Sequence, residues 1–143
     1  MKITFLGTGA MLPTKERNPN AIFISYKSEG ILIDCAEGTQ RQLRYAGISP
    51  TKVTKLLITH WHGDHVLGIP GLLQSLGASN YMKKLEIYGP KGSKNFFKHM
   101  MSGLDFKSRI KYELKEINEG KFFDNDDFYL VSSKVKHSID CLS

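Results

Sequence analysis

The segment VTKLLITHWHGDH, residues 53–65, decides the fold of this chain. Its first seven residues are apolar or β-branched except for one lysine, which is typical of a buried strand. The strand runs directly into four side chains of the kinds that bind metal ions. His60 and His62 are two residues apart, so both side chains point to one side at the end of a strand. Asp64 and His65 follow one turn later.

Four metal-binding side chains within six residues favour a metal site over an incidental polar loop. Imidazole and carboxylate groups suit Zn²⁺, with Mn²⁺ or Fe²⁺ as lesser options. Asp64 is the candidate catalytic residue, because it could bind a second metal or accept a proton from the attacking water. Two neighbouring metal ions would stabilise both oxygens of an in-line displacement at phosphorus.

The remaining sequence alternates between strand and helix patterns, which predicts an α/β fold. The expected strands are residues 2–6, 21–26, 31–35, 53–59, 85–88, 110–117 and 128–135, and the expected helices are 37–46, 66–77 and 94–101. No repeat, low-complexity segment or linker interrupts the chain. One domain, residues 1–143, is the simplest organisation, and this length can bury a real core.

Composition narrows the class of protein. Apolar residues make up 41% of the chain and charged residues 24%, as in globular proteins. No segment has the ~20 apolar residues of a membrane span, and the N-terminus is typical of a first strand and not of a signal peptide. We therefore expect a cytoplasmic protein without a membrane partner. The net charge of +6 is compatible with a nucleic-acid partner, although a lysine-rich solvated face gives the same count.

The string His60-x-His62-x-Asp64-His65 after an apolar strand resembles the hallmark of the metallo-β-lactamase superfamily. Lactamases, glyoxalases, phosphodiesterases and nucleases share that string. The resemblance implies the N-terminal half of a metallo-β-lactamase-type αββα sandwich and a metal-dependent hydrolase. It leaves the substrate open.

Further segments are similar to ribonuclease Z, the endoribonuclease that removes the 3′ trailer from precursor transfer RNA. They lie in that family's order: FLGTG at 5–9, PTKERN at 13–18 for the family's P-x-K-x-R-N loop, DCAEGTQ at 34–40, GIPGLL at 68–73 and KHSI at 136–139. The third of these departs from the family pattern, because Ala36 replaces the usual glycine.

The resemblance to ribonuclease Z implies a role for several residues. His60, His62 and His137 would bind a first zinc ion, and Asp64 and His65 a second. Asp34 would hold a ligand histidine in place, and Lys15, Arg17 and Asn18 would face the 3′ end of the RNA. The resemblance also implies precursor transfer RNA as substrate and a homodimer formed by the helices of residues 37–46 and 69–78.

Without the resemblance, blander interpretations stay open. His137 is then a lone histidine near a strand end, Lys15 and Arg17 are ordinary loop charges, and Asp34 caps a turn. Members of the family are about twice as long, and their second half supplies further metal ligands. We therefore expect a fragment that keeps a three-histidine site, exposes one face of its sheet and is inactive alone. The alternatives are a non-catalytic metal- or RNA-binding half-domain that needs a partner chain, and another metallo-β-lactamase-type hydrolase.

Overall fold

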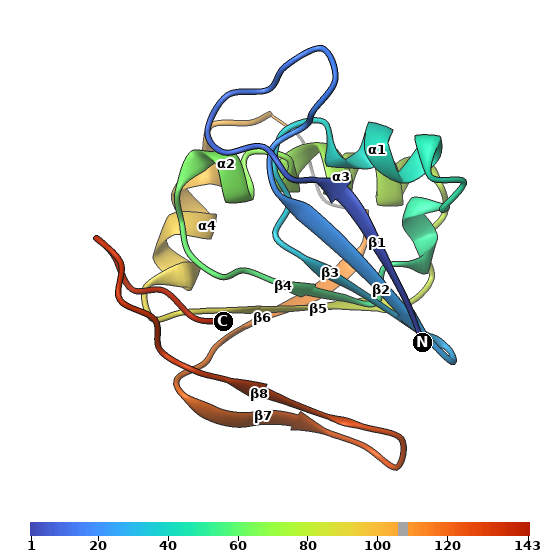
Figure 1. Ribbon diagram of the computed structural model, residues 1–143. Helices are drawn as coiled ribbons and strands as arrows, with labels where there is room; N and C mark the ends of the chain where they lie inside the picture. Colours follow the sequence, from blue (N-terminus) through green and yellow to red (C-terminus); the bar gives the residue numbers. More distant parts are fainter. Residues whose placement is uncertain (106–108) are drawn as a thin grey trace.

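A six-stranded sheet in the order β1-β2-β3-β4-β5-β6 forms the centre of the fold (Figure 1). The computed structural model describes residues 1–105 and 109–143. The strands are β1 (Lys2–Gly7), β2 (Ala21–Tyr26), β3 (Glu29–Ile33), β4 (Lys55–Leu57), β5 (Lys84–Gly89) and β6 (Lys111–Glu116). The first three pair antiparallel as a meander, whereas β3 to β6 pair in parallel. This arrangement confirms the predicted α/β class.

The helices lie on one face of this sheet (Figure 1). They are α1 (Thr39–Tyr45), the short 3₁₀ helix η1 (Pro50–Lys52), α2 (Gly63–Val66), α3 (Ile69–Ala78) and α4 (Ser93–Ser102). Helix α3 shows why they pack there, because its leucines at 72, 73 and 76 and its first residue, Ile69, are all buried in the core. Apolar residues three and four apart share one side of a helix, and that side is covered by the sheet. Within the described residues, no helix is long and apolar enough to cross a membrane.

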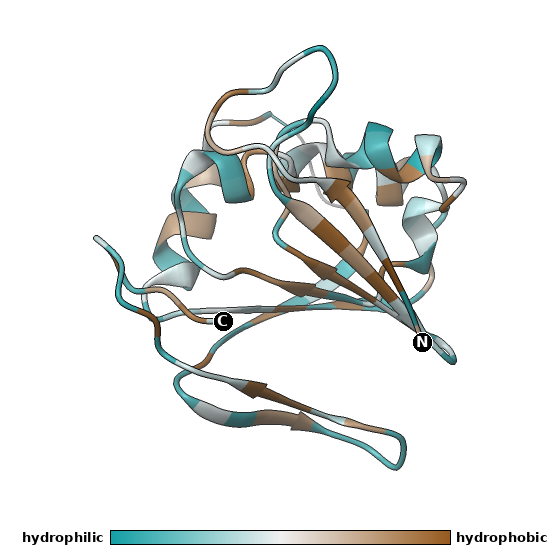
Figure 2. Ribbon diagram, viewed as in Figure 1, coloured by the Kyte–Doolittle hydropathy of each residue, from teal (hydrophilic) through white to brown (hydrophobic). Residues whose placement is uncertain are grey.

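A hairpin of β7 (Gly120–Asp124) and β8 (Tyr129–Ser132) lies across the opposite face of the sheet (Figure 1). Its phenylalanines rest on that face: the Phe122 ring lies 5.2 Å from that of Tyr88, and the Phe128 ring lies 6.0 Å from that of Tyr26. The hairpin leaves the β1 edge open, where Ile3 and Phe5 are 49% and 67% exposed. Figure 2 shows β1 and β2 as strongly hydrophobic strands. We expected one face of the sheet to be exposed. That face is exposed at β1, and the hairpin covers part of the remaining strands.

Several predicted element boundaries were wrong for physical reasons. The strand expected at 31–35 ends at Ile33, because Asp34 has a left-handed backbone with φ of 57°. The helix expected at 66–77 is two helices that meet at Gly68, where a Cβ atom would lie 1.9 Å from the Ala36 carbonyl oxygen. Strand β7 was not predicted, and the strand expected at 128–135 is only Tyr129–Ser132.

The parallel strands bring the candidate site together. The residues after β3 and β4 leave the sheet at the same edge, where ligand sites of parallel α/β sheets form. Backbone hydrogen bonds join the two exits: Asp34 N donates to Leu57 O at 2.8 Å, and Cys35 N donates to His65 O at 2.7 Å. The loop that holds the metal-binding string is therefore fixed to the end of β3.

Candidate metal centre

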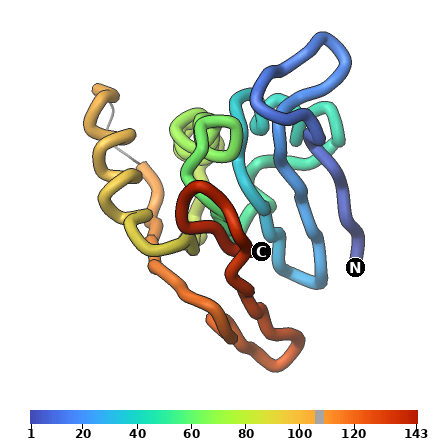
Figure 3. Tube along the Cα trace, turned by 60° about the vertical axis from the view of Figure 1, so that its left-hand side comes forward, coloured from blue at the N-terminus to red at the C-terminus, as the bar shows by residue number. Residues whose placement is uncertain are grey.

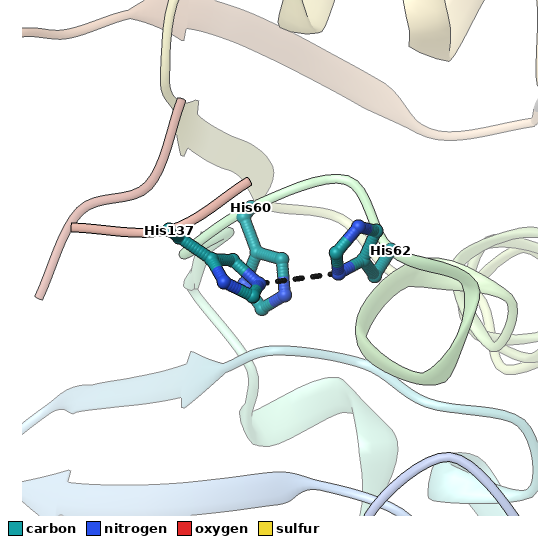
Figure 4. A group of neighbouring side chains, drawn as sticks. All are labelled: His60, His62 and His137. Atoms are coloured by element: carbon teal, nitrogen blue, oxygen red, sulfur yellow. Dashed lines mark hydrogen bonds between the residues drawn. The ribbon is translucent and has the colours of Figure 1, made fainter. Parts of the chain in front are cut away.

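Three of the five predicted metal ligands form one cluster. The ligand atoms of His60, His62 and His137 all lie within 4.8 Å of one another, and His137 Nε2 is 3.2 Å from His62 Nδ1 (Figure 4). His60 is buried, His62 is half-buried and His137 is exposed, so the cluster opens to solvent on one side. Within the described residues it is the only group of three or more histidine, cysteine or carboxylate side chains that could hold a metal ion.

The geometry of this cluster fits a divalent metal ion. Tetrahedral zinc with Zn–N bonds of about 2.0–2.1 Å separates its nitrogen ligands by about 3.4 Å. The contact of 3.2 Å between His137 and His62 already matches that separation, and all the ligand atoms lie within 4.8 Å of one another. The Thr59 hydroxyl lies 2.9 Å from Nδ1 of His60, which leaves the other ring nitrogen for the metal. Three imidazoles with one open position are typical of catalytic zinc sites.

The C-terminal segment, residues 133–143, delivers His137 to the cluster. The segment folds back on itself, and its two ends exchange backbone hydrogen bonds of 2.9 and 3.0 Å. Leu142 N then donates to Thr59 O at 3.0 Å, at the residue before His60. In Figure 3 this segment lies against the chain that follows β4. The third histidine therefore reaches the site through a turn that is attached to the metal-binding loop itself.

Asp34 contacts His65, one of the predicted metal ligands. It is fully buried, and its carboxylate lies 2.7 Å from Nδ1 of His65. Thr59 N and Asn20 Nδ2 also donate to it, at 2.9 and 3.0 Å. A carboxylate on one ring nitrogen fixes the tautomer and orientation of a histidine, so that the other nitrogen can bind a metal.

Asp64 and His65 lie beside the histidine cluster. The His65 ring centroid is 4.0 Å from that of His60, and His65 Nε2 is 3.6 Å from Asp64 Oδ2. The backbone N–H of Met11 donates to the same Asp64 oxygen at 2.9 Å. These two side chains are placed as a second ligand pair would be, and their binding of a second metal stays a prediction.

The surroundings of the site residues shift their pKa values in different directions. Burial and the neighbouring histidines lower the pKa of His60 to about 4, so its ring is neutral and able to bind metal at neutral pH. Burial acts to lower the pKa of His65 also, but the hydrogen bond and charge of Asp34 outweigh it and raise that pKa. Burial acts to raise the pKa of Asp64, but the hydrogen bond from the Met11 N–H and the charge of His65 act more strongly in the other direction. The pKa of this carboxyl group is therefore lower than that of an ordinary aspartate.

The three residues predicted to face RNA lie on one loop but in different settings. Lys15 and Arg17 are exposed at its tip, where Thr14 N donates to Arg17 O at 2.8 Å and closes a tight turn. Asn18 is half-buried, and its amide donates to the Glu37 carbonyl at 2.9 Å. Asn18 therefore holds the base of the loop against the start of α1, and contact of all three with RNA stays a prediction.

Two residues that anchor the site, Met11 and Trp61, were not predicted from the sequence. Met11 acts through its backbone N–H, which no side-chain pattern could indicate. Trp61 donates from Nε1 to the Ser93 hydroxyl at 2.7 Å and stacks on Phe96 at 5.7 Å, and so it joins the metal-binding loop to α4. The position of Trp61 between two predicted ligand histidines could have indicated that it has a structural role. No sequence pattern indicated that Ser93 is its partner.

The fold and the three-histidine cluster define a protein of the metallo-β-lactamase fold. A metallo-β-lactamase-fold protein from Bacillus subtilis, YhfI, superimposes with a TM-score of 0.79 at 17% identity, over 98% of this chain and 56% of its own. The family model described as Anti-Pycsar protein Apyc1 matches residues 1–139. The chain belongs to that family.

The expected resemblance to ribonuclease Z is confirmed. The chain is 42% identical to Ribonuclease Z of Methanothermobacter thermautotrophicus over 97% of its length and 45% of the relative's. The short form of human tRNase Z superimposes with a TM-score of 0.89 at 31% identity, over 99% of this chain and 63% of that one. The chain spans about half the length of the curated relatives that it matches.

Replacing both loop histidines tests the cluster directly. We expect His60→Ala with His62→Ala to reduce retained zinc from about one ion per chain to none after dialysis, because two of three imidazole donors are lost. Elemental analysis by mass spectrometry measures this. His99→Ala is the matched control, because His99 is exposed on α4 and bonds its own helix at Asn95. Unchanged zinc in the double variant would refute the site.

Titration of the metal-free chain tests the electrostatics. NMR should show His60 taking its proton near pH 4 and His65 above 6.5. An unfolded histidine takes its proton near ~6.5, so His60 makes the fold less stable as the pH falls from there toward 4. His65 has the opposite effect: it stabilises the fold below ~6.5, and that stability is lost as the pH rises through its raised pKa. Asp34→Asn should lower the His65 pKa. Protonation of His60 above 6.5 would contradict this account.

Proposed function

We propose that this chain is the metal-binding half of a zinc-dependent endoribonuclease that removes the 3′ trailer from precursor transfer RNA. The observation that carries the proposal is the 42% identity to Ribonuclease Z along 97% of the chain. It is supported by the histidine cluster and by a basic loop attached to the same site through Met11 and Asp64. Zinc is the metal that best suits three imidazoles with an open position.

The chain's own residues would divide the work of phosphodiester hydrolysis. His60, His62 and His137 would hold the metal, which supplies Lewis-acid activation of water and phosphate. Asp64 would accept the proton of the attacking water, since its carboxylate is ionised at neutral pH and its Oδ2 lies 3.6 Å from His65 Nε2, beside the histidine cluster. Lys15 and Arg17 would meet the phosphates or bases at the RNA 3′ end.

We expect no autonomous cleavage by residues 1–143. Asp64 and His65 alone offer two donors to a second metal, whereas stable structural and catalytic sites use three or four protein ligands. A half-domain that binds metal or RNA and needs a partner chain is therefore the first alternative. Another metallo-β-lactamase-type hydrolase is the second, and it is favoured by the family model, whose description differs from the name of the relatives.

A chimaera tests the proposal. Residues 1–143 would be joined to the part of the Methanothermobacter thermautotrophicus relative that follows the matched region, and mixed with a precursor transfer RNA that carries a labelled trailer. We expect cleavage at the trailer junction by the chimaera, none by residues 1–143 alone, and a loss of more than about a hundredfold in Asp64→Ala, in line with removal of a general base.

Two outcomes of this experiment favour the alternatives. Hydrolysis of a simple phosphodiester without cleavage of precursor transfer RNA would favour another hydrolase. Zinc binding without any hydrolysis by the chimaera would favour the half-domain. The intact relative serves as the positive control in both comparisons.

We also propose a homodimer formed through α1 and α3, in a cytoplasmic protein. The apolar side of α3 is buried in its own core, so the contact would use its remaining side and the exposed residues of α1. Tyr45 of α1 is 67% exposed, and its ring lies 5.0 Å from the Arg41 guanidinium. Analytical ultracentrifugation at micromolar concentration should show a dimer that Tyr45→Ala with Arg41→Ala weakens. A wild-type monomer would contradict the proposal.

A further inference from the structure

A second cavity opens beside the metal centre. It has a volume of about 540 Å³ and lies between the start of α4 and the C-terminal segment. The cavity over the histidine cluster has a volume of about 760 Å³. His137 lines both of them, so the two cavities adjoin at a candidate metal ligand. We call the first of them the lysine groove.

The lysine groove carries an excess of positive charge. Lys91, Lys134 and Lys136 line it, against one carboxylate from Asp140. All three lysines are exposed, and none takes part in an ion pair within residues 1–105 and 109–143. Their charges are therefore available to an anionic ligand.

The same groove also offers apolar surface. Val135 and Ile139 line it and are 42% and 39% exposed, and Ile117 lines it as a half-buried side chain. Free phosphate or another small anion would use the lysines and leave this surface unused. A single-stranded nucleic acid would use both, because its phosphates follow a positive groove and its unpaired bases expose flat faces, which the aliphatic side chains of this groove can cover.

The metal cavity adjoins two basic elements. It is walled in part by Ala10 and Met11, from the loop that carries Lys15 and Arg17. It also adjoins the lysine groove at His137. A strand with one phosphate over the histidine cluster could therefore continue from that phosphate into the lysine groove.

We propose that the lysine groove binds a single-stranded RNA segment next to the phosphate that is cut, an inference that rests on the proposed function. Lys91, Lys134 and Lys136 contact its phosphates, and Val135 and Ile139 contact its bases. The groove selects substrates in which the chain is unpaired at this point. Each lysine that neutralises a phosphate releases a counterion, so binding falls with salt by a slope of about 0.7 per contact on a double logarithmic plot.

Binding of an oligouridylate of about ten nucleotides to residues 1–143 tests the groove, by fluorescence anisotropy at several salt concentrations. The groove variant carries Lys91→Ala, Lys134→Ala and Lys136→Ala. It should bind at least tenfold more weakly at low salt, with a salt slope smaller by about two. The control variant carries Lys2→Ala, Lys52→Ala and Lys83→Ala, which removes the same charge from exposed, unpaired lysines that line a different cavity. It should lose much less affinity.

Every other outcome of this experiment overturns the proposal. Equal losses of affinity in the two variants would show a general effect of charge. Unchanged affinity in the groove variant, or no binding by the wild-type chain, would show that the groove is not a binding site. A duplex of the same length that binds as well would refute the preference for a single strand. Both variants should keep the wild-type melting temperature, since the exchanged lysines are exposed. Because no cleavage is measured, failure here is distinct from failure of the chimaera to process transfer RNA.

Discussion

The buried carboxylate of Asp34 is the constraint on which the site depends. A fully buried charge is tolerated only when it is hydrogen-bonded or paired, and Asp34 meets this demand with Thr59, Asn20 and His65. Thr59 in turn contacts the His60 ring through its hydroxyl, and its carbonyl accepts from Leu142 of the C-terminal segment. One buried acid thus links the end of β3, the metal-binding loop and the segment that brings His137.

The two faces of the sheet contribute to the site in different ways. The helix-covered face holds the apolar core and makes the strand ends rigid, and the site is built where those strands end. The opposite face is partly covered by the β7–β8 hairpin, which leads directly into residues 133–143. The hairpin therefore connects the packing of that face to the position of His137, and the exposed Ile3 and Phe5 mark where it stops.

The sequence predicted the α/β class, most strands and the metal-binding loop, because periodicity and the spacing of His60, His62, Asp64 and His65 are local signals. It did not predict β7, whose short apolar pair is flanked by charged residues. The Met11 contact to Asp64 was out of reach, because it depends on a backbone N–H at a left-handed residue with φ of 43°. His137 came only from the resemblance to ribonuclease Z, since a turn 75 residues beyond His62 leaves no pattern between them.

The proposed function requires that three histidines from two distant segments bind one metal ion together. X-ray absorption spectroscopy of the zinc-loaded chain tests it most directly, because it counts the ligands and measures their distances. We expect three imidazole nitrogens at about 2.0–2.1 Å, an oxygen in the remaining position, and the loss of one imidazole in His137→Ala. A zinc ion bound by cysteine sulfur, or a ligand set unchanged in His137→Ala, would contradict it.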